Sequence, residues 1–502
     1  MKKIIRKVAV LGSGVMGSRI ACHFAGTGLP VLLLDRVPTE LTDAEKAKKL
    51  STDHPAFKNR IVNEALTAAI KSNPSPVFSS EVVKLIQAGN FADNMKDIAG
   101  CDWIIEVVVE RLDIKKTIFD EVEKYRKPGT LVSSNTSGIP IHLMTEGRSE
   151  DFKKHFCGTH FFNPPRYLRL LEIIPTPETD PKIIKFLLEY GDLHLGKTTV
   201  LCKDSPAFIA NRVGVFSIMS IFRLMDKLGL TIDQIETLTG PVFGRPKSAT
   251  FRTADVVGLD TLVKVAKGVY ENCPEDEARD VFKIPDWLDK MLKNNWLGDK
   301  TGQGFFAKKK SDKGEREIFT LDLKTFEYKP REKTGFAGLE VAKAVDDLKE
   351  RLKILINLKD KPGDFYRQFH YELFSYVSNR IPEISDEFYR VDDAMRAGFG
   401  WEVGAFETWD VFGVEETIKK MEAAGYKVAA WVKEMLADGF SSFYKIEKGE
   451  KLAYSPGQKK YVSAVTGDPR AFIVMRNFEN QTVWKNSAAR LYHLGDDVLG
   501  LE

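Results

Sequence analysis

Two residues placed symmetrically about a turn could carry out acid–base chemistry. His160 and Glu172 each lie six residues from Arg166, and Asn163-Pro164-Pro165 interrupts the apolar runs that contain them. If a hairpin centres near Arg166, the two side chains face each other across neighbouring strands, with Cβ atoms about 5 Å apart. Glu172 would then hold one imidazole nitrogen, and the other nitrogen could take the proton of a substrate hydroxyl. The pairing predicts a general base, although a lone histidine in an apolar strand is more often a packed core residue.

A glycine-rich turn near the start of the chain predicts a dinucleotide site. Gly12, Gly14 and Gly17 form a GxGxxG pattern that follows a short apolar run and opens a helical stretch. The first glycine permits a tight turn, the second lets the backbone approach a pyrophosphate, and the third lets helix and strand pack closely. The phosphates would lie at the helix N-terminus. The residues expected there are Gly12, Ser13, Gly14, Val15, Met16 and Gly17.

An acidic residue ends the next apolar run, which covers residues 30–35. A carboxylate at Asp35 can accept both hydroxyls of the adenosine ribose and repel a 2′-phosphate, which favours NAD over NADP. A solvated strand end is the alternative for Asp35, and the glycine pattern alone is also compatible with FAD.

The first 200 residues alternate strand-like apolar runs with helical stretches, a pattern typical of a parallel α/β sheet. After Pro206 helical periodicity dominates. The expected strands cover residues 7–11, 30–34, 103–109, 130–134 and 157–162.

Segments of the helical half recur. Residues 251–260 resemble residues 406–415, and a shorter match pairs Asn211-Arg212 with Asn379-Arg380. A polar, hairpin-like stretch follows each copy, at 304–330 and 439–464. We interpret the chain as one α/β domain followed by a duplicated helical domain. Chance similarity between short helix–turn segments is the alternative.

Composition excludes several classes of function. The net charge is +3, from 74 basic and 71 acidic residues. The sequence has no stripe of Lys, Arg and aromatic residues, the pattern that would indicate nucleic-acid binding. No apolar run reaches the roughly 18 residues of a membrane span. Five scattered cysteines without a CxxC pair suit a reducing compartment, so we expect a cytoplasmic protein. A metal site from His155, Cys157 and His160 is not expected, because His155 and His160 fall on opposite strand faces.

Several motifs together resemble the 3-hydroxyacyl-CoA dehydrogenase family. They span residues 7–306, and the second helical copy extends the likeness to about residue 440. Besides the glycine turn and Asp35, the motifs are Glu106-Val-Val-Val-Glu110 with Lys115, Ser134-Asn-Thr-Ser137, His160-Phe-Phe-Asn163-Pro, Asp204 to Arg212, and Lys300-Thr-Gly-Gln-Gly304.

The resemblance implies NAD-dependent oxidation of L-3-hydroxyacyl-CoA to 3-ketoacyl-CoA in fatty acid β-oxidation. His160 would be the general base and Glu172 its orienting partner, while Ser137 and Asn211 hold the substrate oxygen. The residues that would contact the ribose and nicotinamide half of NAD are Glu110, Lys115, Asn163 and Lys300. Alternatively, Glu110 and Lys115 are an exposed pair at the start of a helix, Lys300 is a solvated loop lysine, and Asn211 is a helix-capping or packing residue.

The resemblance also implies a domain order. We expect a Rossmann-type NAD-binding domain at 1–203, mainly α-helical C-terminal domains at 204–334 and 335–465, and a tail at 466–502. The second helical copy has no glycine turn. It would fill the place of a second subunit in single-copy relatives, so the chain could act as a monomer.

Two regions depart from the family pattern or add to it. Residues 41–84, where the family places a helical arm for coenzyme A, match no simple pattern. Lys46, Lys49 and Lys58 in this segment could contact CoA phosphates or be solvated.

The pattern of the tail at 487–502 predicts a hairpin, which resembles the opening of an enoyl-CoA hydratase (crotonase-type) domain. This resemblance implies that the chain is the dehydrogenase portion of a bifunctional enzyme with an enoyl-CoA hydratase domain, or of a descendant that lost the hydratase; an ordinary packed hairpin is the alternative. A thiolase is a further expected partner. The hydratase's oxyanion-hole donors and acidic residues are not present.

Two rival functions stay open. A dehydrogenase of free β-hydroxyacids would share the glycine pattern but normally relies on a catalytic lysine. A non-catalytic scaffold of a β-oxidation assembly is the other. The sequence does not fix acyl-chain length or the direction of the reaction.

Overall fold

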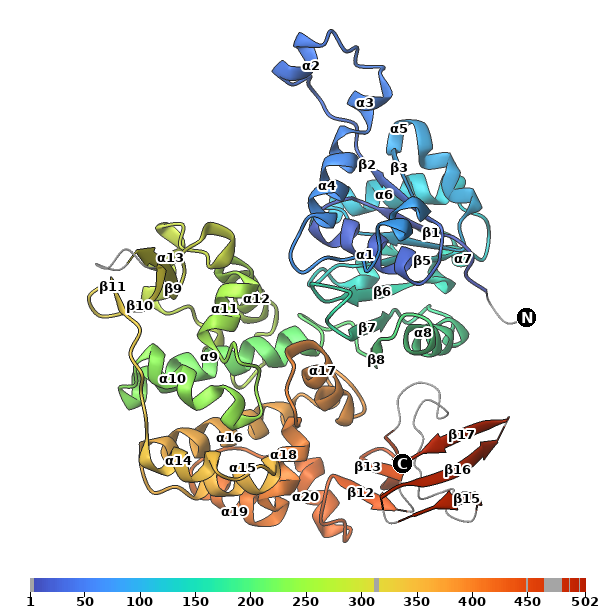
Figure 1. Ribbon diagram of the computed structural model, residues 1–502. Helices are drawn as coiled ribbons and strands as arrows, with labels where there is room; N and C mark the ends of the chain where they lie inside the picture. Colours follow the sequence, from blue (N-terminus) through green and yellow to red (C-terminus); the bar gives the residue numbers. More distant parts are fainter. Residues whose placement is uncertain (1–3, 311–315, 448–449, 465–480, 487, 496) are drawn as a thin grey trace.

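The computed structural model describes residues 4–310, 316–447, 450–464, 481–486, 488–495 and 497–502. One large sheet is followed along the chain by two helical parts, each ending in a small sheet, and then by a third small sheet (Figure 1).

Eight strands form the large sheet in the order β3-β2-β1-β4-β5-β6-β7-β8. Every neighbouring pair is parallel except β6 and β7, which run antiparallel. The strands are β1 (Val8–Leu11), β2 (Val31–Asp35), β3 (Ile86–Asn90), β4 (Trp103–Glu106), β5 (Leu131–Ser134), β6 (Phe156–Phe161), β7 (Leu170–Pro175) and β8 (Thr198–Leu201).

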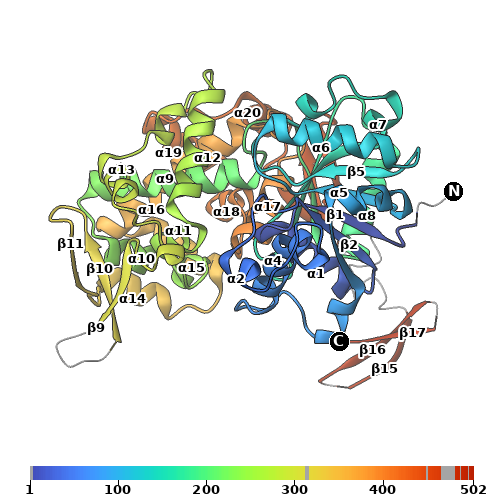
Figure 2. The ribbon, with the colours of Figure 1, turned by 90° about the horizontal axis from the view of Figure 1, so that it is seen from above.

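Helices cover both faces of this sheet, so its strands are buried on both sides, as expected for a mainly parallel sheet. Ala9 and Leu11 belong to the core that contains Phe119 of α6, whereas Val8 joins the core that contains Phe24 of α1. Figure 2 shows α6 and α7 on one side of the strands and α1 and α4 on the other. The helices of this part are α1 (Val15–Gly26), α2 (Asp43–Ala47), α3 (Pro55–Lys58), α4 (Arg60–Ile70), α5 (Phe91–Asn94), α6 (Leu112–Tyr125), α7 (Glu150–Lys154) and α8 (Pro181–Leu193).

The expected strands agree with the observed ones, except that residues 107–109 leave the sheet after β4. Strands β3 and β8, at the two edges of the sheet, were not among the expected strands. The mixed sequence of β3, Ile-Gln-Ala-Gly-Asn, has no apolar periodicity.

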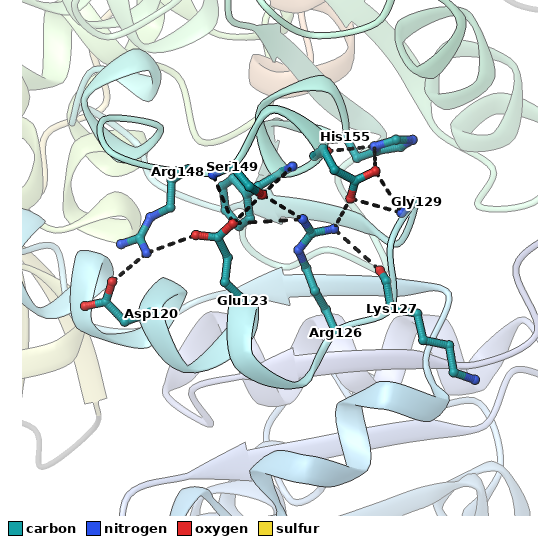
Figure 3. A network of polar contacts seen from close by, with 10 residues as sticks. Asp120, Glu123, Arg126, Lys127, Gly129, Arg148, Ser149 and His155 are labelled. Carbon is teal, nitrogen blue, oxygen red and sulfur yellow. Dashed lines mark hydrogen bonds and ion pairs between the residues drawn. The ribbon is translucent and has the colours of Figure 1, made fainter.

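A polar network joins the end of α6 to the segment before α7 (Figure 3). The guanidinium of Arg126 lies 2.6 Å from Asp151, and Arg148 lies 2.5 Å from Asp120. Ser149 donates its hydroxyl to Glu123 at 2.6 Å. These contacts hold α7 and the segment before it against α6.

The helical body contains two runs of elements in the same order. Each run is a 19-residue helix, four shorter helices and a three-stranded antiparallel sheet. The first run is α9 (Ala210–Leu228), α10 (Ile232–Thr239), α11 (Phe251–Val257), α12 (Leu259–Asn272), α13 (Asp286–Lys293), β9 (Phe306–Lys310), β10 (Arg316–Asp322) and β11 (Glu327–Pro330). After α14 (Ala337–Lys343) and α15 (Leu348–Asn357), the second run is α16 (Lys361–Asn379), α17 (Tyr389–Phe399), α18 (Ala405–Phe412), α19 (Val414–Ala423), α20 (Ala430–Ala437), β12 (Tyr444–Glu447), β13 (Glu450–Ser455) and β14 (Lys460–Ser463).

One buried carboxylate recurs with the same contacts in both runs. Asp255 accepts the backbone N–H groups of Phe305 and Phe306, each at 2.9 Å. Asp410 accepts those of Phe443 and Tyr444, each at 2.8 Å. Each carboxylate thereby ties its helix to the start of its small sheet. The matching contacts support a duplication, and the domain boundaries at 203, 334 and 465 stay a prediction.

The shorter match, of Asn211-Arg212 with Asn379-Arg380, is wrong because the two pairs do not lie at equivalent positions. Asn211 lies in the first turn of α9, but Asn379 is the last residue of α16. The two helices correspond to each other, whereas the two Asn-Arg pairs lie at opposite ends of them.

The tail forms a small antiparallel sheet from β15 (Thr482–Lys485), β16 (Arg490–Gly495) and β17 (Val498–Leu501). The expected hairpin is therefore present, with Asp497 at φ +59° in its turn. Residues 465–480, 487 and 496 of the expected tail domain lie outside the described residues. In the described parts of the chain, no helix is both long and apolar enough to cross a membrane.

Candidate active site

His160 and Glu172 form a close pair in the antiparallel part of the sheet. They are direct partners in the register of β6 and β7, and His160 Nδ1 lies 2.6 Å from Glu172 Oε2. Glu172 is fully buried and His160 is 6% exposed. The hairpin geometry expected from the sequence is thus present.

Glu172 is held from a second direction by the start of α9. Its Oε1 accepts the backbone N–H groups of Ile209, at 3.1 Å, and Ala210, at 2.8 Å. A carboxylate at a helix N-terminus is favoured by the free amides and by the helix dipole. The thiol of Cys202 also lies beside Glu172, and burial together with that negative charge raises the pKa of Cys202. The carboxylate is therefore fixed in one orientation.

Strand β6 also meets the loop that follows β5. The side chain of Asn135 accepts the N–H of Phe161 at 2.9 Å, directly after His160. This contact brings Ser137, two residues further on, to the end of β6. The His160 ring packs between Phe162, at a centroid distance of 4.6 Å, and Phe208, at 5.8 Å. The imidazole is thus enclosed by aromatic rings.

Glu110 and Ser137 belong to one polar cluster. Glu110 Oε1 accepts the hydroxyl of Thr136 at 2.6 Å and the N–H of Ser137 at 2.9 Å. Lys115 is 1% exposed and lies 3.4 Å from Glu110 and 2.8 Å from Glu106. Burial acts to raise the pKa of Glu110, but the charge of Lys115 and the hydrogen bonds outweigh it, so the pKa is lowered. Because Lys115 is buried, it does not reach the surface of this site itself, and its charge influences the site through Glu110.

Lys300 lies on the helical body rather than in this cluster. It is exposed, forms an ion pair with Asp260 in the first turn of α12, and packs against Gly258. Lys264 lies one helical turn after Asp260, and its charge helps to lower the pKa of Glu110. This face of α12 is therefore directed at the Glu110 cluster.

The glycine turn has the geometry that a dinucleotide needs. Gly12 has φ +105°, and a Cβ at Gly17 would lie 1.8 Å from the carbonyl oxygen of Gly12, so only glycine fits at either position. A Cβ at Gly14 would meet nothing within 4 Å, which leaves open space over the start of α1. Val15, in the first helical turn, is 66% exposed. Helix α1 has no side-chain cap and no acidic residue in its first turn, so its free N–H groups suit a phosphate.

Asp35 is already oriented toward this turn. Its Oδ2 accepts both the N–H and the hydroxyl of Ser13 at 2.6 Å, and its Oδ1 accepts the N–H of Arg36 at 2.7 Å. Asp35 is half-buried at the end of β2, beside the glycine turn. The position matches the one expected for a ribose-binding carboxylate.

Two asparagines predicted for the site lie around the His160 pair. Asn163 is exposed after β6 and accepts a guanidinium N–H of Arg19, in α1, at 2.5 Å. Asn211 is half-buried and follows Ala210, whose N–H binds Glu172. Their contacts with substrate or NAD stay a prediction.

The segment expected to form an arm contains α2 and α3, which project from the edge of the sheet (Figure 1), and α4, which packs against α1, β2 and β3. Lys46 is paired with Asp43 at 3.4 Å and Lys58 with Asp93 at 3.0 Å. Lys49 takes a left-handed conformation, with φ +51°. All three remain candidates for CoA phosphates.

His155 does not join the His160 site. Its Nδ1 lies 2.8 Å from the carbonyl oxygen of Asp151, within the network of Figure 3. Within the described residues, no group of three or more His, Cys, Asp or Glu side chains could hold a metal ion.

Sequence reasoning missed several residues that build the site. Cys202 and the amides of Ile209 and Ala210 come from segments 30 or more residues after Glu172, so no local spacing connects them to it. Glu106, Asn135 and Lys264 were also not singled out. Glu106 and Asn135 lie inside motifs that were recognised for other members.

The fold and these contacts define a dinucleotide-binding enzyme of the dehydrogenase class. Residues 7–205 match the family model described as the NAD binding domain of 3-hydroxyacyl-CoA dehydrogenase, and residues 208–308 match its C-terminal domain. The chain belongs to the 3-hydroxyacyl-CoA dehydrogenase family.

Relatives agree with this assignment. A probable 3-hydroxyacyl-CoA dehydrogenase of Bacillus subtilis is 45% identical over the whole chain, which spans 63% of that protein's length. A probable 3-hydroxyacyl-CoA dehydrogenase of Deinococcus radiodurans is 42% identical over 63% of the chain and 86% of its own length.

A solved structure shows the same fold. The 3-hydroxybutyryl-CoA dehydrogenase of Escherichia coli has a TM-score of 0.59 at 19% identity, over 86% of this chain and 98% of that one.

Proposed function

We propose that the protein oxidises the 3-hydroxyl group of an L-3-hydroxyacyl-CoA to a ketone, with NAD as hydride acceptor. The observation that supports it best is the His160–Glu172 pair, in which Glu172 is fixed at both oxygens. A base held in this way is what removal of a hydroxyl proton requires.

His160 takes the proton at Nε2 in this proposal. Glu172 accepts from Nδ1, which keeps that nitrogen protonated and leaves a lone pair on Nε2. As the proton moves to Nε2, the imidazole becomes cationic, and the buried carboxylate of Glu172 stabilises that charge. The substrate carbon loses its hydrogen with both bonding electrons, and the C–O bond becomes a carbonyl.

Ser137 and Asn211 would hold the substrate oxygen during this step. The Asn135–Phe161 contact brings the Ser137 loop to the end of β6, and the Ala210–Glu172 contact brings the start of α9 there. Two donors aimed at one oxygen stabilise the charge that develops on it.

The glycine turn and Asp35 would hold NAD, and NAD when bound supplies the hydride acceptor. The open space above Gly14 and the free N–H groups of α1 fit a pyrophosphate, and Asp35 fits the ribose hydroxyls. Glu110, Asn163 and Lys300 would contact the nicotinamide half, with Lys115 behind Glu110.

The second helical copy acts here as a positioning body. Helix α17 packs against β7, which carries Glu172, against α9, which carries Asn211, and against β8, which Cys202 directly follows (Figure 1). A Cβ at Gly398 of α17 would lie 2.7 Å from Leu170 and 3.7 Å from Ala210, so the packing is close. This arrangement supports a chain whose site does not need a second subunit.

An accompanying hydratase is part of the proposal. A putative fatty acid oxidation complex trifunctional enzyme of Rickettsia felis is 31% identical over 81% of this chain, which covers 53% of that protein. We propose that an enoyl-CoA hydratase, as a domain or a partner, supplies the hydroxyacyl-CoA, and that a thiolase uses the product. Cytoplasmic location is part of the same proposal.

The experiment is a substrate panel. NADH formation is measured with L-3-hydroxyacyl-CoAs of increasing chain length, each beside its free hydroxyacid. We expect turnover of the thioesters and little of the acids. Equal kcat/KM for the two series would contradict the acyl-CoA proposal and favour a free hydroxyacid dehydrogenase.

A further inference from the structure

Asp204 opens the motif that leads into α9, and its side chain is 13% exposed. Both of its oxygens accept hydrogen bonds from a segment that lies 62 and 63 residues earlier in the chain. The carboxylate of Asp204 therefore joins two parts of the molecule that are distant in sequence.

The segment that Asp204 binds is the end of the loop that carries Ser137. Oδ1 of Asp204 accepts the N–H of Ile141 at 2.8 Å, and Oδ2 accepts that of His142 at 2.9 Å. Nδ1 of the His142 ring lies 2.7 Å from the same Oδ2. Nearer its start the loop is held by Glu110, which accepts the N–H of Ser137 at 2.9 Å. The Ser137 loop is thus fixed on both sides, once by Glu110 and once by Asp204.

A strained turn lies between Asp204 and α9. Ala207 and Phe208 have φ +64° and +52°, in the left-handed region that residues other than glycine rarely adopt. Such residues persist only where the surrounding contacts fix them, and they are concentrated at functional sites. On the α9 side the turn is fixed by Glu172, which accepts the N–H groups of the two residues after Phe208. On the other side it is fixed by Asp204.

The two segments that Asp204 joins carry the two residues proposed to hold the substrate oxygen. Ser137 lies on the loop, and Asn211 follows the strained turn in the first turn of α9. Two donors stabilise charge on one oxygen only while both stay within hydrogen-bond distance of it. A misplacement of about 1 Å can cost roughly 10²-fold in rate. One carboxylate that binds both segments keeps their separation constant.

We propose that Asp204 is a positioning residue that holds Ser137 and Asn211 at a fixed separation around the substrate oxygen. It acts through the backbone of the two segments rather than by touching substrate or NAD. His142 adds a contact from the outer side, where its side chain is 54% exposed. This inference rests on the proposed function.

Asp410 provides a matched control in the second helical copy. It also uses one oxygen for each of two backbone N–H groups, those of Phe443 and Tyr444, both at 2.8 Å. In either aspartate, a change to asparagine keeps the shape, removes the charge and turns an NH2 group toward a backbone N–H. Both variants should therefore lose stability in denaturant unfolding. Only Asp204→Asn should also disturb the active site.

The affinity for two CoA thioesters measures how well the oxygen is held. A 3-ketoacyl-CoA carries the oxygen and the saturated acyl-CoA of equal length lacks it, so the ratio of their Kd values reports the contacts of that oxygen. Both are titrated calorimetrically into the full chain with NAD present, which cannot reduce the ketone, at the chain length that the wild type binds most tightly. We expect the preference for the ketone to fall roughly 2- to 10-fold in Asp204→Asn, the factor for one hydrogen bond, and to stay at the wild-type value in Asp410→Asn.

Turnover provides the second measurement. We expect kcat to fall roughly 10- to 100-fold in Asp204→Asn, with Kd for NAD within about twofold of wild type, and to stay unchanged in Asp410→Asn. His142→Ala removes only an exposed side chain, so it should fold and lower both kcat and the Kd ratio roughly two- to fivefold, as expected for one exposed contact.

Wild-type kcat and Kd ratio in Asp204→Asn, or in His142→Ala if Asp204→Asn does not fold, would overturn the proposal. So would an equal loss of both quantities in Asp410→Asn, because the effect would then follow from stability alone. A wild-type chain that does not oxidise any 3-hydroxyacyl-CoA would instead contradict the proposed function, and the Kd ratios would still test the role of Asp204.

Discussion

Replacing Glu172 by glutamine removes the charge behind His160 and keeps the shape. Oε1 of Glu172 serves two backbone amides, so the glutamine oxygen takes that place and its NH2 group faces Nδ1 of His160. Nδ1 must then accept a hydrogen bond, and the ring proton moves to Nε2. In that form Nε2 cannot take the substrate proton. The opposite orientation points the NH2 group at the amides of Ile209 and Ala210 and is also unfavourable.

The expected loss follows from one charge-assisted hydrogen bond. Such a bond contributes about 1.5–3 kcal/mol, or roughly 10- to 150-fold in rate. We therefore expect kcat for NADH formation to fall by that factor in Glu172→Gln, while the Kd for NAD stays unchanged, because the glycine turn lies on other strands.

Steady-state rates and an NAD titration on the same preparation measure both quantities. Glu146→Gln, which neutralises an exposed carboxylate paired with Lys116, is the matched control and should behave as wild type. A kcat of Glu172→Gln within twofold of wild type, with its fold intact, would refute the proposed orientation of the base.

Three further changes test other parts of the molecule. Asp35→Ala should raise the Kd for NAD and reduce the preference for NAD over NADP. If titration gives the wild-type Kd for both cofactors, the adenosine ribose binds elsewhere. Asp255→Asn and Asp410→Asn each disturb a buried carboxylate that accepts two backbone amides, so each should destabilise the fold by about 1–3 kcal/mol in denaturant unfolding. Only Asp255→Asn should also raise KM for NAD, because Asp255 packs against the loop that carries Lys300; an equal KM in both variants would contradict that link. The 502-residue chain should not hydrate crotonyl-CoA, and measurable hydration would show that hydratase residues were overlooked.

The His160–Glu172 pair could be predicted because antiparallel strands pair residues at equal distances from a turn. The glycine turn was likewise local, with a strand before it and a helix after it. Both features depend on spacing within a few residues, which the sequence displays directly.

The supports of these residues could not be predicted in the same way. Cys202 and the start of α9 reach Glu172 only after β8 has joined the sheet beside β7. Lys115 forms a buried ion pair with Glu106 of β4, and no helical or strand periodicity relates these two positions. The Asn211 and Asn379 segments show the opposite error, because a short match without periodicity does not fix its place on a helix.

The most direct test of the account is the turnover of His160→Ala beside its affinity for NAD. His160 is proposed to touch the substrate hydroxyl and not the adenosine half of NAD. We expect kcat with an L-3-hydroxyacyl-CoA to fall by at least the roughly 10²–10⁴-fold that general-base help contributes, with Kd for NAD within about twofold of wild type. Comparable kcat values for wild type and His160→Ala would contradict the central claim.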